Sequence, residues 1–299
     1  MKKAPQINIF GEVEEQDLIL RDKFIEPPFS VLDTKSGNWQ RRKRIWKNIG
    51  IKSEIGRSDD MTYKGAVKSL DYYRQKEGKV KESKEQGTSI FDPALCEVLY
   101  HWFCVGGKEI LDPFAGGSVR GIVANKLGYK YTGIDIRQEQ IDSNRHQGID
   151  ILEIDNQPNW YVGDSNKVLN NFNKEFDFVF SCPPYADLEV YSDLEGDISN
   201  KPYKEFMLAY ESIIKKSCNL LKSGGYACFV VGEVRDKKGN YIGFVPDTIN
   251  AFRKAGMSFY NEGILLNPVA SASMRAGKQF SAGQKLVKIH QNVLIFKKP

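Results

Sequence analysis

The sequence predicts an α/β fold in which a doubly wound, mostly parallel sheet carries helices on both faces. One observation is that, after residue 88, short apolar stretches typical of strands alternate with longer helical patterns. The second is that two predicted strands end in unusual turns, KEILDPFAGG over 108–117 and SCPPY over 181–185. Ligands of open parallel sheets bind beyond the carboxyl ends of the strands, so both turns fall where a ligand site is expected.

The predicted domain begins with an apolar helix over 93–103, for which Asp92 and Pro93 suit the N-cap and the first helical position. The next elements are a strand over 109–113, a helix over 118–127 and a strand over 131–136. Aromatic and β-branched residues predict five more strands. They span 160–162, 176–181, 226–232, 258–266 and 292–297. Helical spacing predicts helices over about 203–221 and 245–255, the latter with Gly256 at its C-cap.

The first 85 residues are predicted to form a basic extension of a domain that spans 86–299. Residues 1–34 have the composition of an extended arm or small cap, which Glu-Pro-Pro-Phe at 26–29 interrupts. Residues 74–87 are almost wholly charged or polar, which is typical of a linker or mobile loop.

Residues 35–57 contain eight basic residues and one acidic residue. Basic side chains can pair with phosphates, and interleaved tryptophans can stack on bases or sugars. This interpretation assigns DNA contacts to Trp39, Arg41, Arg42, Lys43 and Arg44. The alternative is a solvated helix whose tryptophans, Trp39 and Trp46, dock on the main domain.

Composition narrows the class of protein. In 299 residues, 43 Lys and Arg against 38 Asp and Glu give a net charge of +5, which suits a polyanionic partner without requiring one. No stretch approaches the roughly 20 apolar residues of a membrane span, and no signal-peptide core follows the N-terminus. The five cysteines lack the spacing of a zinc site or disulfide framework. A cytoplasmic protein without a membrane partner, a disulfide or a metal is expected.

Acidic residues end three successive predicted strands. Asp112 precedes Gly116 and Gly117, where glycines let the backbone approach a ligand closely. Asp135 follows near the spacing at which an acidic residue takes ribose hydroxyls, and Asp164 follows the third strand. A helix N-cap is the alternative for each Asp. Three in succession favour a ligand site.

The second turn is stiff because neither Pro183 nor Pro184 can donate to a sheet, and each restricts the residue before it. Together the two turns resemble those of the S-adenosylmethionine-dependent DNA amino-methyltransferases, which modify the exocyclic nitrogen of adenine or cytosine. Residues 112–116 (DPFAG) match the family pattern D-x-F-x-G, and 183–185 (PPY) match the last three of the four positions in the family's second pattern, Asp/Asn/Ser-Pro-Pro-Tyr/Phe. Cys182 departs from the Asp, Asn or Ser that the family carries there. The resemblance covers roughly residues 86–299. The arrangement of this part of the chain is similar to that of small phage or mobile-element methylases.

The resemblance implies a Rossmann-like, seven-stranded methyltransferase sheet and S-adenosyl-L-methionine as the cofactor. The implied cofactor contacts are Phe91, Asp112, Phe114, Ala115, Gly116, Gly117, Asp135, Ile136 and Asp164. The implied catalytic residues are Cys182, Pro183, Pro184 and Tyr185. In the family the side chain at the position of Cys182 and the carbonyl of the following proline accept hydrogen bonds from the target amine, and the aromatic residue stacks on a flipped base.

Thiol sulfur is a weak acceptor, and this slightly favours N4 of cytosine over N6 of adenine as the target. A covalent role for Cys182 in methylating carbon 5 is disfavoured, because the enzymes of that reaction carry Pro-Cys and this chain has Cys-Pro. After the turn, 186–193 are predicted to close over the target or to form a surface loop, with Tyr191 as a candidate stacking residue.

Residues 267–290 contain four basic residues and no acidic one. They are predicted to form a long loop that faces DNA through Arg275, Lys278 and Lys285, the alternative being a surface excursion. The expected function is site-specific methylation of double-stranded DNA, as in restriction-modification. An RNA base methyltransferase and a catalytically weak, cofactor-binding DNA-binding protein are the alternatives. The sequence leaves open the recognition sequence, a homodimer and a restriction-system partner.

Overall fold

The computed structural model describes residues 15–52, 91–185, 194, 196–236, 238–267 and 272–299. Eight strands are described: β1 Val31–Asp33, β2 Glu109–Asp112, β3 Lys130–Asp135, β4 Asn159–Val162, β5 Phe176–Ser181, β6 Leu221–Val231, β7 Ser258–Leu266 and β8 His290–Lys297. They form one sheet in the order β1-β7-β8-β6-β5-β2-β3-β4. Only β8 runs antiparallel to its described neighbours, β6 and β7. The predicted doubly wound, mostly parallel α/β sheet is confirmed.

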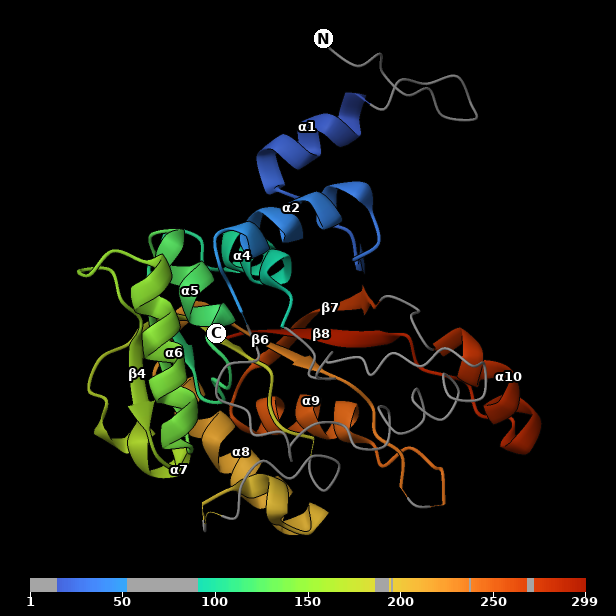
Figure 1. Ribbon diagram of the computed structural model, residues 1–299. Coiled ribbons are helices and arrows are strands. Elements are labelled where there is room, and N and C mark those ends of the chain that lie inside the picture. The colour runs from blue at the N-terminus through green and yellow to red at the C-terminus, as the bar shows by residue number, and fades with distance from the viewer. Residues whose placement is uncertain (1–14, 53–90, 186–193, 195, 237, 268–271) are drawn as a thin grey trace, which may run out of the picture.

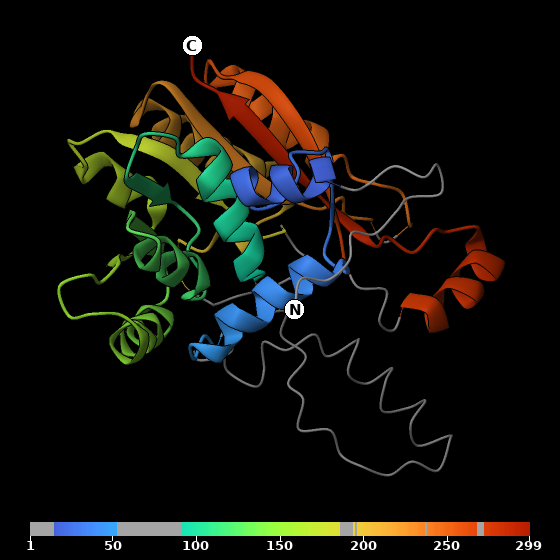
Figure 2. The ribbon, with the colours of Figure 1, turned by 90° about the horizontal axis from the view of Figure 1, so that it is seen from above.

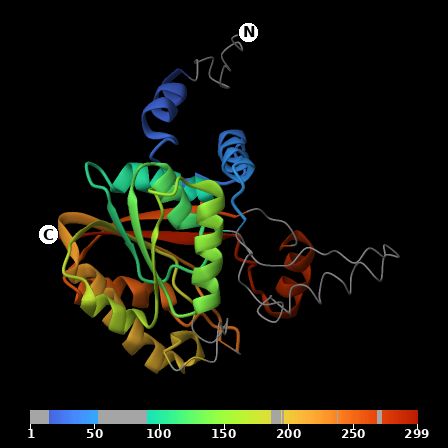
Figure 3. The same cartoon turned by 60° about the vertical axis from the view of Figure 1, so that its left-hand side comes forward.

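Helices cover both faces of the sheet (Figures 1 and 3). One face carries α2 Gly37–Asn48, α4 Pro93–Phe103, α5 Val119–Lys126 and α6 Gln138–Ile151, and the other carries α8 Tyr203–Asn219 and α9 Phe244–Lys254. Further helices are α1 Glu15–Phe24, α7 Ser165–Val168 and α10 Ala272–Gly283, with short 3₁₀ turns at Leu169–Asn171 and Ile198–Asn200. Each helical layer has its own apolar core against the sheet, as expected for stacked layers of secondary structure.

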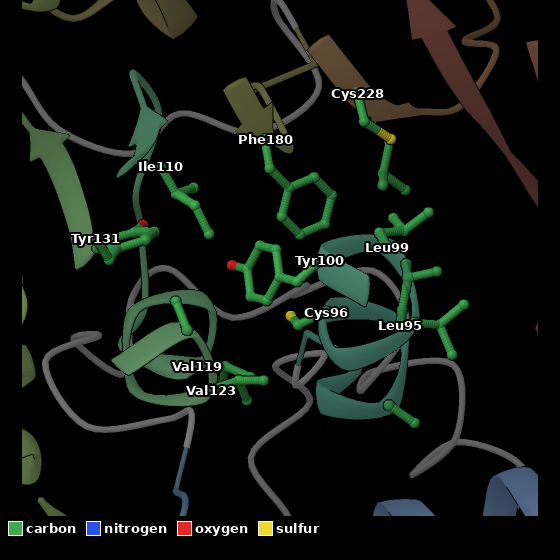
Figure 4. Packing of buried hydrophobic residues seen from close by; sticks show 14 of the residues in the cluster. Leu95, Cys96, Leu99, Tyr100, Ile110, Val119, Val123, Tyr131, Phe180 and Cys228 are labelled. Carbon is green, nitrogen blue, oxygen red and sulfur yellow. The ribbon is translucent and has the colours of Figure 1, made fainter. Parts of the chain in front are cut away.

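The core beneath the first turn is built around Tyr100 of α4 (Figure 4). Its ring packs edge-on against Phe180 of β5 with centroids 5.5 Å apart, and its hydroxyl donates to the carbonyl of Arg120 at 2.9 Å. Buried tyrosine hydroxyls need such partners. The contact ties α4 to α5, the helix that follows the DPFAGG turn.

Several predicted elements have the predicted bounds, namely the helix over 93–103 and the strands over 176–181 and 258–266. The predicted C-cap of α9 is also confirmed. Gly256 adopts a left-handed φ of +83°, and the amides of Gly256 and Met257 donate to the carbonyls of Arg253 and Phe252. This is the Schellman pattern, in which glycine ends a helix without strain.

The prediction of seven strands was one short, because the N-terminal extension supplies β1. This strand pairs parallel with β7 at the edge of the sheet, and three residues are too few to show the alternation of a strand. The predicted break at 26–29 is confirmed, since α1 ends at Phe24 and Ile25 has a φ of +73°. The predicted domain boundary and the 74–87 linker lie outside the described residues.

Two of the longer helices were not predicted. In α6 the buried side chains are mainly polar, among them Gln140, Asn144 and Gln147, so the helix lacks the apolar periodicity that marks others. The predicted long loop over 267–290 is wrong in part, because 272–283 form α10. Its Ala, Met, Arg, Lys and Gln residues favour helix, and this outweighs its glycines.

Asp177 of β5 fixes the start of β2. One carboxylate oxygen accepts the amides of Lys108 and Glu109 at 2.8 and 2.9 Å, and the other accepts Lys222 Nζ at 2.6 Å. Partial burial acts to raise the pKa of Asp177, but the hydrogen bonds from Lys222 and the two amides outweigh it. The pKa therefore lies below its ordinary value of 3.8.

Asp177→Asn is expected to lower stability at neutral pH and to flatten its loss in acid. Since the folded pKa is depressed, the carboxylate contributes stability that is present above the unfolded pKa and is lost as the pH falls through the folded pKa. Urea midpoints measured from neutral pH to about pH 3 test this. The gap between variant and wild type should close in acid, and a constant gap contradicts the assignment.

Candidate functional site

The DPFAGG and SCPPY turns leave adjacent parallel strands at the same edge of the sheet. β2 pairs with β5 through Leu111 and Val179, and the turns begin just beyond, after Asp112 and Ser181. The Ser181 hydroxyl donates to Asp112 Oδ1 at 2.5 Å. The sequence predicted two ligand-facing turns, and the structure places them side by side.

Asp112 is the centre of a buried cluster and has no exposed surface. Oδ2 accepts Arg120 Nε at 2.5 Å and the Tyr131 hydroxyl at 2.6 Å. Oδ1 accepts the amide of Phe114 at 3.1 Å as well as the Ser181 hydroxyl. The carboxylate is thus engaged by four protein donors, which leaves it facing the protein interior and not a ligand.

Arg120 extends this cluster to the backbone of the first turn. Its Nη2 donates to the carbonyls of Phe114 and Ala115, both at 2.7 Å. Burial acts to lower the pKa of Arg120, but the Asp112 carboxylate outweighs burial, so the pKa lies above its ordinary value and the guanidinium stays charged. A buried ion pair that also donates hydrogen bonds to two carbonyls of the turn holds the turn in one conformation.

Gly116 lies in the first turn and is half-buried. Its φ of +51° is left-handed, and no atom outside its immediate neighbours lies within 4 Å of the point where a Cβ would stand. Its amide donates to Asp135 Oδ2 at 3.0 Å, and its carbonyl accepts Asn144 Nδ2 at 2.7 Å. The turn is anchored from below and open above, as close backbone approach of a ligand requires.

Asp135 ends β3 beside that turn. Its other oxygen accepts the amide of Arg137 at 2.8 Å. Burial raises the pKa of Asp135 above its ordinary value of 3.8, and the hydrogen bonds from Arg137 and Gly116 offset the rise only in part. Each carboxylate oxygen has a second lone pair and can accept a further donor, such as a hydroxyl.

Asp164 caps α7, with Oδ1 accepting the amide of Asn166 at 2.8 Å. Asp164 is therefore a helix N-cap, the predicted alternative, and this role occupies one of its two carboxylate oxygens. Asp164 lies close to Asp135, because the amide of Gly163 donates to the Asp135 carbonyl at 2.9 Å. A Cβ on Gly196 would stand 2.9 Å from Ile136 and 3.1 Å from Asp164. The ends of β3 and β4 and the chain near 196 thus converge beside the first turn.

The second turn is held by β8 and α9. The Tyr185 hydroxyl accepts Gln291 Nε2 at 3.0 Å, and its ring packs edge-on against Phe244 with centroids 5.9 Å apart. Cys182 is half-buried, while the other four cysteines of the chain are buried. Pro183 is buried and Pro184 is half-buried. The turn is fixed before any ligand arrives, which lowers the entropy cost of binding.

Phe91 lies beside the buried cluster. Its ring packs edge-on against Phe180 at 5.8 Å, and the Arg120 guanidinium carbon lies 4.6 Å from its centroid. This is a cation–π contact. The predicted packing of Phe91 on a cofactor stays a prediction, and residues 88–90 that precede it lie outside the described residues.

The basic helix α2 is docked on α4. Trp39 is 1 % exposed and Trp46 is also buried. Their indole nitrogens donate to Asp92 and Glu97, which also pair with Lys43 at 2.9 Å and Arg42 at 2.6 Å. The prediction that Trp39 stacks on DNA is therefore wrong for this conformation, and the docking alternative describes the tryptophans. Arg41 and Arg44 are exposed, and their DNA contact stays a prediction.

α10 projects from the sheet edge that carries the two turns (Figures 1 and 2). Arg275 and Lys278 lie on it and are exposed, as is Lys285 beyond its end. Met274 and Phe280 are 59 % and 52 % exposed. Because β8 follows α10 and carries Gln291, this basic excursion returns to the sheet beside Tyr185.

Several residues of the site escaped the sequence analysis. Arg120 could have been found from the sequence, because it is the one basic side chain within the apolar first turns of α5. Tyr131, Asn144 and Gln291 had none, because their roles come from contacts across elements. Tyr191 and the rest of 186–193 lie outside the described residues.

Among the described residues, no group of three or more His, Cys, Asp or Glu is arranged to hold a metal ion. No described helix has both the length and the apolar character needed to cross a membrane. Burial raises the pKa of Cys104 and Cys218 to about 12, so these thiols behave as small buried hydrophobes.

No protein-family model matches the chain, and no curated protein is significantly similar to it. Among solved structures, TrmN from Thermus thermophilus is 12% identical with a TM-score of 0.45 over 70% of this chain and 49% of its own, so this chain spans about half its length. The magnesium protoporphyrin IX methyltransferase ChlM from Synechocystis PCC 6803, with bound SAM, is 13% identical with a TM-score of 0.42 over 95% and 98%. A candidate DNA modification methylase, also from Thermus thermophilus and complexed with S-adenosyl-L-methionine, is 22% identical with a TM-score of 0.36 over 46% and 54%.

Proposed function

We propose that this protein transfers a methyl group from S-adenosyl-L-methionine to an exocyclic amino nitrogen of a base in double-stranded DNA. The observation that supports this most directly is the junction of the two turns, which the Ser181–Asp112 hydrogen bond joins. A transfer between two bound molecules needs both held at one place and in line. The first turn suits the donor, and the second suits a flat acceptor.

The residues around the first turn fit the proposed cofactor. The open space above Gly116 admits a ligand against the backbone, and Asp135 keeps acceptor capacity for ribose hydroxyls. Asp164 has a second oxygen for the adenine amino group. Phe114, Ala115, Gly117 and Ile136 would line the same place. When bound, the cofactor supplies an electrophilic sulfonium methyl group.

The second turn would hold the base. An exocyclic amine is a poor nucleophile because the ring delocalises its lone pair. The Pro183 carbonyl and Cys182 would accept hydrogen bonds from that amine and so orient the lone pair, with Pro184 stiffening the turn and Tyr185 stacking on the flipped base. As sulfur is a weak acceptor, the Pro183 carbonyl would carry most of this task. N4 of cytosine remains slightly favoured over N6 of adenine.

The DNA partner is inferred from the charge of the α10 excursion. Residues 272–290 carry Arg275, Lys278, Lys285 and Lys288 and no acidic residue. They leave the sheet at the edge of the two turns and return beside Tyr185 through Gln291. A basic element that adjoins the base site can grip phosphates next to a flipped nucleotide.

The proposal is tested by incubating the purified protein with methyl-labelled S-adenosylmethionine and either duplex DNA, structured RNA or no nucleic acid. Label in DNA alone is expected. Transfer to RNA in place of DNA would favour the RNA base methyltransferase. Cofactor binding with no label in either polymer would favour the catalytically weak DNA-binding protein. Tyr185→Ala is the matched variant and should weaken base stacking by roughly 1 to 3 kcal/mol.

Replacing Arg275 and Lys278 together with alanine is expected to weaken duplex binding and reduce its salt dependence. If each contacts one phosphate, the slope of log affinity against log salt falls by about 2. Fluorescence anisotropy with a labelled duplex at several salt concentrations measures this slope. The control removes Lys215 of α8 and Arg253 of α9, two exposed basic residues near the ends of the helices that lead into β6 and β7, and so near the opposite edge of the sheet. Equal slopes in both variants contradict the role of α10.

A further inference from the structure

We infer that Ser181 is a positioning residue that sets the distance between the methyl donor and the acceptor amine. This inference rests on the proposed function and concerns how the same site is held together. Ser181 is the last residue of β5 and directly precedes Cys182. It is completely buried, and its hydroxyl donates to Asp112 at 2.5 Å. The hydroxyl therefore faces the protein and not the substrate.

Ser181 joins β5 to β2 beyond the point where their backbone pairing ends. Between β2 and β5 the paired residues are Ile110 with Phe178 and Leu111 with Val179. Beyond that point the two chains lead into their turns, and the Ser181–Asp112 hydrogen bond joins them. On its other side Ser181 is still paired with Phe229 of β6. The residue before Cys182 is thus fixed both to the sheet and to the first turn.

Asp112 connects Ser181 to the first turn through hydrogen bonds. Its carboxylate is fully buried and takes four protein donors, so its role is to hold the turn and not to bind the amino group of a cofactor. Arg120 joins Asp112 to the carbonyls of Phe114 and Ala115. A continuous set of hydrogen bonds therefore runs from the residue before Cys182 to the residue before Gly116.

The consequence for transfer is geometric. A displacement of about 1 Å between reacting groups can cost about 100-fold in rate without a change in binding. Removing the Ser181 hydroxyl breaks the hydrogen bond to Asp112 and leaves both turns present. The expected result is therefore a loss in the rate of the chemical step with little change in affinity for either substrate.

The test compares Ser181→Ala with Ser217→Ala, which also removes a buried serine hydroxyl but in α8, where it donates to the Ile213 carbonyl. Single-turnover methyl transfer to duplex DNA should fall by about 10- to 100-fold in Ser181→Ala. Dissociation constants for S-adenosylmethionine and DNA should change by less than about threefold. Ser217→Ala should transfer at the wild-type rate.

Ser181→Thr keeps the hydroxyl and should restore the rate to within about threefold of wild type. This variant also keeps the inference open to refutation if Ser181→Ala fails to fold. An alanine variant as fast as wild type overturns the inference. A slow alanine variant whose loss in rate is fully explained by a lower affinity for one substrate also overturns it. A folded Ser181→Thr protein that transfers methyl groups as slowly as Ser181→Ala does so as well.

A second readout separates this inference from the proposed function. Cys182 is half-buried while the other four cysteines are buried, so its alkylation by iodoacetamide reports the position of the second turn without any methyl transfer. Ser181→Ala should change that rate several-fold, and Ser217→Ala should leave it unchanged. If wild type never methylates nucleic acid, the proposed function fails, and the alkylation rates still decide whether Ser181 holds the turn. Identical alkylation rates overturn the inference.

Discussion

Arg120→Met is expected to lower the free energy of unfolding by about 3 to 5 kcal/mol, because it leaves the Asp112 carboxylate buried without its counterion. The side chains of Asp112 and Arg120 are 0 % and 6 % exposed, and their closest atoms lie 2.5 Å apart. The variant also removes the donor to the carbonyls of Phe114 and Ala115. Methionine fills part of the volume, so the loss is chiefly electrostatic.

Urea denaturation followed by circular dichroism measures this loss. The surface control is Arg145→Met, whose pair with Asp142 is about half exposed and should contribute roughly 0 to 1 kcal/mol. Adding Asp112→Asn to Arg120→Met removes both buried charges and should recover part of the stability. An Arg120→Met protein within about 1 kcal/mol of wild type contradicts the buried ion pair as the anchor of the first turn.

Asp135→Ala is expected to lower the affinity for S-adenosylmethionine by about 100-fold or more. Two ribose hydroxyls that donate to a carboxylate contribute at least about 1.5 kcal/mol each, and a total near 3 kcal/mol corresponds to about 100-fold. The variant also frees the Gly116 amide, which Asp135 accepts at 3.0 Å. Isothermal titration calorimetry measures the affinity, with Asp142→Ala of α6, whose side chain is about half exposed, as the control. Similar affinities in both variants contradict the assignment.

The same carboxylate gives cofactor binding a pH dependence. Hydroxyls donate best to the ionised form, so affinity should fall as the pH is lowered through the pKa of Asp135. Burial raises that pKa above 3.8, and the fall should begin at a higher pH than an exposed aspartate would give. Asp135→Asn has no charge to lose and should bind weakly with no such fall. A fall of the same size in Asp135→Asn assigns the titration to another group.

Much of the fold could be predicted because strong local patterns coincide with the elements. Apolar stretches such as 176–181 and helix signals such as Asp92-Pro93 and Gly256 mark their own boundaries. What failed had weak or short patterns. β1 has three residues, α6 buries amide side chains in place of apolar ones, and α10 buries little more than Ala272. For such elements the decisive contacts lie elsewhere in the chain.

For the candidate site, the sequence predicted the two turns but not the side-chain contacts around them. The glycines and prolines of the turns constrain the backbone whatever surrounds them, so both turns could be predicted from the sequence. The direction of a carboxylate could not, because it depends on partners brought by other elements. Asp112 therefore looked like a cofactor ligand, whereas Arg120 and Tyr131 engage it inside the protein.

The central claim is methyl transfer to an exocyclic base nitrogen, and the product nucleoside tests it most directly. Duplex DNA treated with the protein and S-adenosylmethionine is digested to nucleosides and analysed by mass spectrometry. The expected result is N4-methylcytosine or N6-methyladenine, which also settles the target base, with much less product from the Tyr185→Ala variant. The absence of both nucleosides from DNA, or methylation at carbon 5 of cytosine alone, would contradict the account.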